Sequence, residues 1–112
     1  MPASQQLDHV FHALADPYRR SMVERLSRGP ASVKQLAAPI DLALPSAVKH
    51  LKVLEDGGLV VSKKAGRVRT YTIKPQALAS IGRWVKQRET AMNQAFDRLA
   101  QAMTDFPEQD TK

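Results

Sequence analysis

The 112-residue sequence contains no cysteine and few aromatic residues, and both absences limit what the protein can do. Without thiols, disulfides, thiolate metal sites and cysteine nucleophiles are excluded. Aromatic side chains make up only 5% of the residues, which argues against stacking platforms for single-stranded nucleic acid. No apolar run approaches the roughly 18 residues that span a membrane, and the first residues lack the pattern of a signal peptide. These features predict a soluble protein of the cytoplasm with no membrane partner.

Patterns that support catalysis or metal binding are also scarce. The chain has no glycine-rich phosphate loop and no nucleophile elbow, so we expect a protein that is not an enzyme and needs no cofactor. His9 and His12 lie three apart beside Asp8 on an expected helix, where side chains can converge. Zinc needs four ligands, or three and water, so a second chain would have to add Glu89 or Asp97. We expect exposed helix surface here, with no metal.

Positive charge is what the sequence does have, and it is concentrated in one block. Lysine and arginine number 17 against 11 aspartate and glutamate residues, which gives a net charge of +6 and a pI near 10.0. Residues 43–74 hold seven of the basic residues and two of the acidic ones, so this block nearly accounts for the whole excess. Such a concentration is the electrostatic footprint of a nucleic-acid-binding protein. The alternative is that the cations protect an exposed hairpin edge from aggregation.

Apolar spacing and the positions of glycine and proline predict a single domain, mainly α with a small β component (α+β). We expect five helices and two strands, with residues 1–6 and 105–112 flexible. The fourth helix is expected to bury Val48, Leu51 and Leu54, or nearby positions such as Ala47. The expected helices cover residues 7–15, 17–27, 32–38, 45–56 and 76–104, and the expected strands cover residues 59–63 and 69–73.

The order of the middle elements indicates a winged helix-turn-helix with a two-stranded β-wing. A basic amphipathic helix follows a short helix and a turn, stops at Gly57-Gly58, and leads into a basic hairpin with Gly66 at its tip. A recognition helix reads DNA bases mainly through its N-terminal residues, and a basic wing contacts backbone phosphates. We therefore expect double-stranded DNA as partner, contacted by Ser46, Lys49, His50, Lys52, Lys63, Lys64, Arg67 and Arg69.

The last expected helix, residues 76–104, carries a broad apolar side that needs a second surface. A long helix outreaches so small a domain at about 1.5 Å per residue, and an identical helix from a second subunit supplies such a surface. This predicts a homodimer. Trp84 and Met92 could also line a pocket for a small molecule, but packing is the favoured interpretation. The expected interface residues of this helix are Trp84, Met92, Phe96, Leu99 and Met103.

Three segments together resemble one protein family. FHALADPYRRSMVERL, LPSAVKHLKVLEDGGLV and KKAGRVRTYTI resemble the first helices, the recognition helix and the wing of ArsR-type winged-helix transcriptional regulators. The resemblance spans about residues 7–103. It implies a homodimer that pairs through its first and last helices and represses transcription from operator DNA. Leu7, Val10 and Phe11 of the first helix then join the expected interface.

The sequence departs from this family at its metal sites. The third helix, VKQLAA, lacks the cysteine pair of the arsenic and cadmium sensors, and the last helix lacks the histidines of the zinc sensors. The resemblance therefore implies DNA binding and dimerisation but leaves open whether an inducer, metal or small molecule, exists. Val48 also stands where a polar residue is common. The alternatives are an interaction module for an acidic protein and a metal-responsive repressor with a non-cysteine site.

Overall fold

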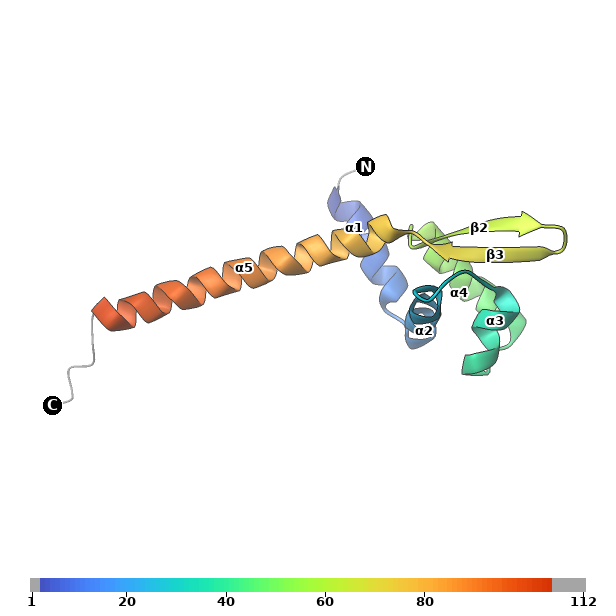
Figure 1. Ribbon diagram of the computed structural model, residues 1–112, viewed down its shortest axis with the longest axis horizontal. Helices are drawn as coiled ribbons and strands as arrows, with labels where there is room; N and C mark the ends of the chain where they lie inside the picture. The colour runs from blue at the N-terminus through green and yellow to red at the C-terminus, as the bar shows by residue number, and fades with distance from the viewer. Residues whose placement is uncertain (1–2, 106–112) are drawn as a thin grey trace. The chain divides into compact units, whose positions relative to one another are not determined.

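The computed structural model describes the backbone of residues 3–105, which divide into two compact units within Met1–Ile81 and Gly82–Lys112. The described residues form five α-helices, one short 3₁₀ helix and three strands (Figure 1). α1 begins earlier than expected, inside the N-terminal segment predicted to be flexible. The elements are α1 (Ala3–Leu14), α2 (Pro17–Leu26), β1 (Ala31–Ser32), α3 (Val33–Ala37), η1 (Ala38–Ile40), α4 (Leu44–Asp56), β2 (Val60–Ala65), β3 (Val68–Ile73) and α5 (Pro75–Asp105).

Capping residues fix where the short helices of the first unit begin. The Asp16 carboxylate accepts a hydrogen bond of 3.1 Å from the backbone N–H of Arg19 and is the N-cap of α2. Ser32 and Gln35 form a reciprocal capping box at the start of α3. Both arrangements satisfy backbone donors that a helix leaves unpaired in its first turn. The predicted starts of these two helices, at residues 17 and 32, are therefore confirmed to within one residue.

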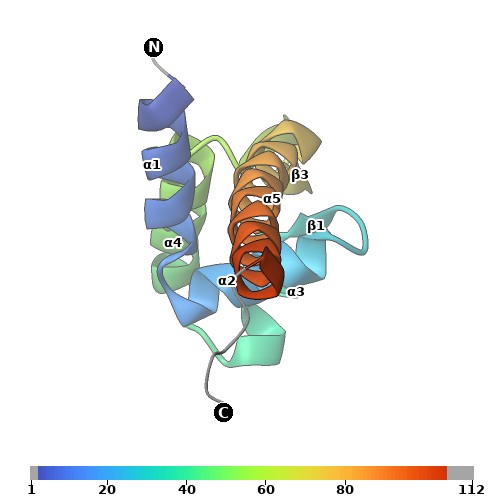
Figure 2. The same cartoon turned by 90° about the vertical axis from the view of Figure 1, so that its left-hand side faces the viewer.

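The core of the first unit lies where α1, α2, α3 and the sheet surround α4. Three α4 residues, Ala47, Leu51 and Leu54, are fully buried, as expected, and α1 runs beside α4 (Figure 2). The expectation that α4 also buries Val48 is wrong, because this side chain is 49% exposed. At 3.6 residues per turn, Val48 lies about 100° around the helix from Ala47 and so points past the core.

The sheet is antiparallel and has one strand more than the sequence predicted. Its order is β1-β3-β2, with Ala31 opposite Tyr71 and Val60 opposite Ile73. The hairpin of β2 and β3 is the expected wing, and Gly66 takes the positive φ of 64° that its tight turn requires. β1 escaped prediction because two residues carry no detectable alternation. Figure 1 shows the hairpin lying beside α3 and α4, with its turn at the end away from α1.

The second unit consists of the continuation of α5 from Gly82, and one side of this helix is apolar. The large apolar side chains of this segment are between 39% and 65% exposed. Their spacing of three, four and seven residues puts most of them on one face. Within residues 3–105, none of the helices combines the length and the apolar composition of a membrane span. The exposed side chains are Trp84, Val85, Met92, Phe96, Leu99 and Met103.

Candidate nucleic-acid interface

The helix-turn-helix consists of α3, the 3₁₀ turn η1 and α4. Asp41 closes the turn in the left-handed conformation, with φ of 51°, which aspartate tolerates better than most residues. Pro45 lies in the first turn of α4, and the N-cap Ala43 provides no side-chain hydrogen bond. The first turn of α4 therefore presents backbone donors that no capping side chain occupies, and such donors can face an anion.

The N-terminal half of α4 exposes two of the predicted DNA-contacting residues. Ser46 and Lys49 are exposed and belong to the side of α4 away from its buried residues. Lys52 is exposed one turn further on, where its ammonium group lies 3.1 Å from the Asp56 carboxylate. An exposed pair of this kind contributes little to stability, so Lys52 can exchange its partner for a phosphate at small cost.

His50, also predicted to contact DNA, is directed toward the protein instead. Its Nδ1 lies 3.3 Å from Nη1 of Arg19 and 3.8 Å from the carboxylate of Asp16. Its ring centroid is 5.6 Å from that of Tyr18, and its side chain is 21% exposed. These contacts join the middle of α4 to the start of α2. His50 thus has a structural environment that the sequence did not reveal.

Arg19 also connects the start of α2 to the end of α1. Its Nε donates a 2.6 Å hydrogen bond to the carbonyl of Ala13, and its Nη2 donates to the carbonyl of His12 at 3.2 Å. Arg20 likewise donates to the carbonyl of Leu14 at 2.8 Å. Both guanidinium groups therefore satisfy the last carbonyls of α1. Arg19 and Arg20 therefore both make contacts inside the domain.

The environment of Asp16 lowers the pKa of its carboxyl group. Partial burial raises this pKa, but the hydrogen bond from the Arg19 N–H and the neighbouring His50 and Arg19 side chains lower it by more. The net result is a pKa below the ordinary value of 3.8. The N-cap of α2 is therefore ionised through the neutral range and strengthens the cap of this helix.

The register of the wing separates its cations onto two faces. Lys64 pairs with Arg69 and Lys63 pairs with Thr70, and adjacent residues of a strand point to opposite faces. Lys64 and Arg69 therefore share the face that includes buried Tyr71, whereas Lys63 lies on the other face. Arg67 lies in the turn next to Gly66 and is exposed. The four predicted wing contacts surround the hairpin rather than forming one flat patch.

A short hydrogen-bonded chain ties the wing to the end of α4. Arg69 Nη1 donates to the Ser62 hydroxyl at 2.8 Å, and that hydroxyl donates to the Glu55 carboxylate at 3.1 Å. Within residues 3–105, no ion pair occupies Lys49, Lys63, Lys64 or Arg67. These four cations remain available to an external anion.

An open groove of about 450 Å³ lies between the helix-turn-helix and the wing. Val48 and Leu44 contribute apolar surface from α4, and Lys34 contributes a cation from α3. Sequence reasoning singled out none of these three as DNA contacts. Only Lys34 carried a signal, a basic residue in the first turn of the first helix of the pair. The groove is lined by Ser32, Val33, Lys34, Leu44, Val48, Arg67, Val68 and Arg69.

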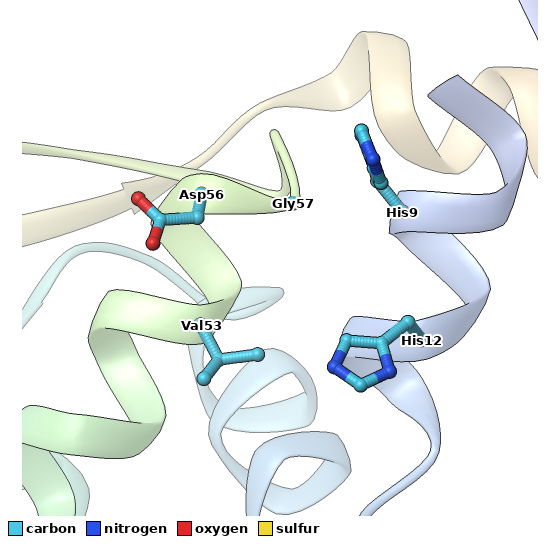
Figure 3. A pocket seen from close by; sticks show the side chains of 5 residues that line it. All are labelled: His9, His12, Val53, Asp56 and Gly57. Carbon is cyan, nitrogen blue, oxygen red and sulfur yellow. The ribbon is translucent and has the colours of Figure 1, made fainter. Parts of the chain in front are cut away.

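The histidines considered for a metal site lie at a separate hollow of about 350 Å³ between α1 and α4. Figure 3 shows His12 directed toward Val53, while the Asp56 carboxylate points away from both His9 and His12. Among residues 3–105, no group of three or more histidine, cysteine, aspartate or glutamate side chains is placed to hold a metal ion.

The residues expected at a dimer interface fall into two groups. Phe11 of α1 is 39% exposed and Leu7 is partly exposed, whereas Val10 is only 5% exposed and belongs to the core. Because Val10 packs in the core of the first unit, its side chain offers little surface to a second subunit. The α5 members of the set, Trp84, Met92, Phe96, Leu99 and Met103, are all exposed.

Comparisons with known proteins agree with this geometry. A family model described as a helix-turn-helix domain matches residues 14–63. The HTH-type transcriptional regulator Rv2034 of Mycobacterium tuberculosis is 42% identical over 74 residues, 66% of this chain and 69% of that protein. The uncharacterized HTH-type transcriptional regulator YuzN of Bacillus subtilis is 35% identical over 81 residues, 66% of this chain and 88% of that protein.

Two solved structures extend the likeness to the fold. The crystal structure of an ArsR family transcriptional regulator, RHA00566, has 44% identity and a TM-score of 0.75, covering 80% of this chain and 93% of that one. The homodimeric winged helix-turn-helix DNA-binding domain of Mb0332 from Mycobacterium bovis has 26% identity and a TM-score of 0.64, covering 80% and 84%. The helix-turn-helix, the wing and these relatives agree: the chain belongs to the ArsR family of winged helix-turn-helix transcriptional regulators and is a DNA-binding protein.

Proposed function

We propose that the protein is a homodimeric repressor that binds an imperfect inverted repeat in double-stranded operator DNA in the cytoplasm. The observation that carries this proposal is the set of cations on α4 and the wing that have no carboxylate partner within residues 3–105. Charged side chains left free on neighbouring elements attract a polyanion.

In this proposal, the N-terminal half of α4 enters the major groove. Lys49 donates to guanine edges or to phosphate, and Ser46 donates to either. Lys52, one turn further along, contacts a phosphate after leaving Asp56. His50 acts as a positioning residue, because its contacts with Asp16 and Arg19 orient α4 on α2.

The wing supplies phosphate contacts on the flank of the same site. Arg67 at the turn has the greatest reach, since the turn is exposed on both sides. Lys64 and Arg69 follow one face of the hairpin and Lys63 the other, so the hairpin presents charge to a backbone that curves around it. Such contacts add affinity and fix orientation but carry no sequence information.

Dimerisation supplies the symmetry of the operator. The exposed apolar face of α5, with Phe96 and Leu99 near its middle, pairs with the same face of a second copy, and α1 adds Leu7 and Phe11. A two-fold dimer places two copies of α4 in successive major grooves, about 34 Å apart. The similar domain from Mycobacterium bovis is homodimeric, which supports a dimeric state for this protein.

The experiment is a gel shift with the DNA that flanks the protein's own gene. Lys49→Ala and Arg67→Ala each remove a charge from the proposed surface, and we expect the double variant to lose detectable binding. Lys86→Ala removes an equivalent exposed charge from α5 and is the matched control, for which binding stays near that of the wild type. Unchanged binding by the double variant would contradict the proposal.

A further inference from the structure

Val48 has an apolar side chain that is nevertheless exposed to solvent. It lies in the second turn of α4, is 49% exposed, and has Leu44, 42% exposed, one turn before it on the same flank. Of the remaining apolar residues of this helix, Ala47, Leu51 and Leu54 are fully buried, and Val53 is partly buried against the core. Two large apolar side chains are thus held at the surface of the N-terminal half of the recognition helix, where a solvent-facing position would normally be polar.

The surroundings of Val48 indicate what kind of partner covers it. Val48 and Leu44 line the groove of about 450 Å³ between α3, α4 and the wing. The cations of this groove, Lys34, Arg67 and Arg69, come from elements on both sides of α4, and none of the described residues that line it is acidic. Apolar side chains that lie between basic side chains suit a partner that presents a methyl group next to anionic groups.

Duplex DNA offers such a combination at only one base. In the major groove, thymine alone presents a C5-methyl group, whereas cytosine presents an N4 donor. A valine contacts the methyl group favourably and leaves the cytosine donor without a hydrogen bond, which costs free energy in a desolvated contact. We propose that Val48 is a specificity-determining residue that reads the methyl group of one thymine in each half-site, with Leu44 completing the apolar contact.

This inference rests on the proposed function, because it requires α4 to lie in the major groove. It adds a base identity that the cations do not provide. Lysine and arginine contacts to phosphate are the same for every sequence, and the Ser46 hydroxyl contacts either kind of base edge. A contact with thymine is therefore a source of selectivity at a position that has no hydrogen-bonding side chain.

The test begins with duplexes that the full-length protein selects from a random library. Each thymine of the selected site is then replaced by deoxyuridine, which removes only the methyl group, and the dissociation constants are measured by fluorescence anisotropy. We expect one thymine per half-site whose replacement weakens binding about fourfold, the effect of one buried carbon group. Replacement in both half-sites should weaken binding about fifteenfold, since the two contacts are independent.

Variants connect this effect to Val48. In Val48→Ala the thymine-to-uracil ratio should fall to near one, because the side chain no longer reaches the methyl group. Val61→Ala is the matched control: Val61 is 46% exposed on β2 and does not line the groove, so its variant should keep the wild-type ratio. Both side chains are already exposed, so neither truncation leaves a core cavity.

The outcomes separate this inference from the function on which it rests. If the wild type enriches no duplex from the library, both the DNA-binding proposal and the thymine contact fail. If sites are enriched but every uracil replacement is neutral, or the ratio persists in Val48→Ala, the contact assigned to Val48 is overturned while the function stands.

Discussion

The absence of a side chain at Gly57 allows α1 and α4 to approach each other closely. A Cβ atom built at this position would lie 2.9 Å from the Ala13 Cβ and 3.0 Å from the His9 carbonyl oxygen. Its backbone is ordinary, with φ of −78°, so the requirement for glycine is steric and not conformational. The sequence showed Gly57-Gly58 as a helix stop, but it could not show that the first glycine is needed for packing between two helices.

We predict that Gly57→Ala lowers the free energy of unfolding by about 1–3 kcal/mol, the usual cost of overpacking a close contact. Gly82→Ala is the control, since a Cβ at Gly82 meets nothing within 4 Å. Within α5 this change should be neutral or stabilise by up to about 1 kcal/mol. Urea denaturation of both variants measures the difference, and equal stabilities would refute the packing argument.

The Asp16 carboxylate gives a prediction for pH. Its pKa is lower in the folded protein than in the unfolded chain, so its ionised form stabilises the fold above the ordinary pKa of about 4. This contribution disappears as the pH falls through the lower folded pKa. Asp16→Asn retains a capping side chain but no titration. The stability gap between wild type and variant should shrink between about pH 5 and pH 2, and a constant gap would exclude Asp16 as its source.

Several residue assignments followed from the sequence pattern. Two features could not be predicted from it: the contacts of His50 and the exposure of Val48. The N-caps Asp16 and Ser32 depend on neighbours three residues away, so a local sequence pattern can reveal them. The contacts of His50 with Asp16 and Arg19 join residues 31 or more positions apart, beyond any local pattern. The exposure of Val48 was missed because hydrophobicity indicates burial without showing which flank of a helix meets the core.

At the scale of elements, the sequence predicted the helices and the wing because each has a strong local signal. Amphipathic spacing, proline and glycine define α2, α4 and the turn of the hairpin. The short strand β1 has no such signal, since it forms only by pairing with β3. α5 was predicted almost in full, and its apolar side is the feature that calls for a partner.

We predict that Phe96→Glu converts the dimer to a monomer at micromolar concentration. The change removes a large apolar contact from both subunits and adds two charges, so dimer affinity should fall more than about a hundredfold. Gln94→Glu adds the same charge on the opposite side of α5 and should leave the dimer intact. Sedimentation velocity distinguishes the two states. A monomeric wild type, or a dimeric Phe96→Glu, would contradict pairing through this face.

For the protein as a whole, DNA binding depends on charge that several elements bring to one surface. The recognition helix, the wing and α3 contribute cations from separate parts of the sequence. The charge block was evident in the sequence between residues 43 and 74, but Lys34 lies outside it. Composition predicted the sign of the partner's charge, and only the fold shows which cations adjoin the same groove.

The dependence of DNA affinity on salt tests this claim most directly. Each phosphate contact contributes about −0.9 to the slope of log K against log salt concentration. In a dimer, Arg67→Ala removes two contacts, so the slope should become shallower by about 1.8, whereas Lys86→Ala should retain the wild-type slope. A slope that stays the same in Arg67→Ala, or wild-type binding that does not depend on salt, would contradict the assignment of the wing to the DNA backbone.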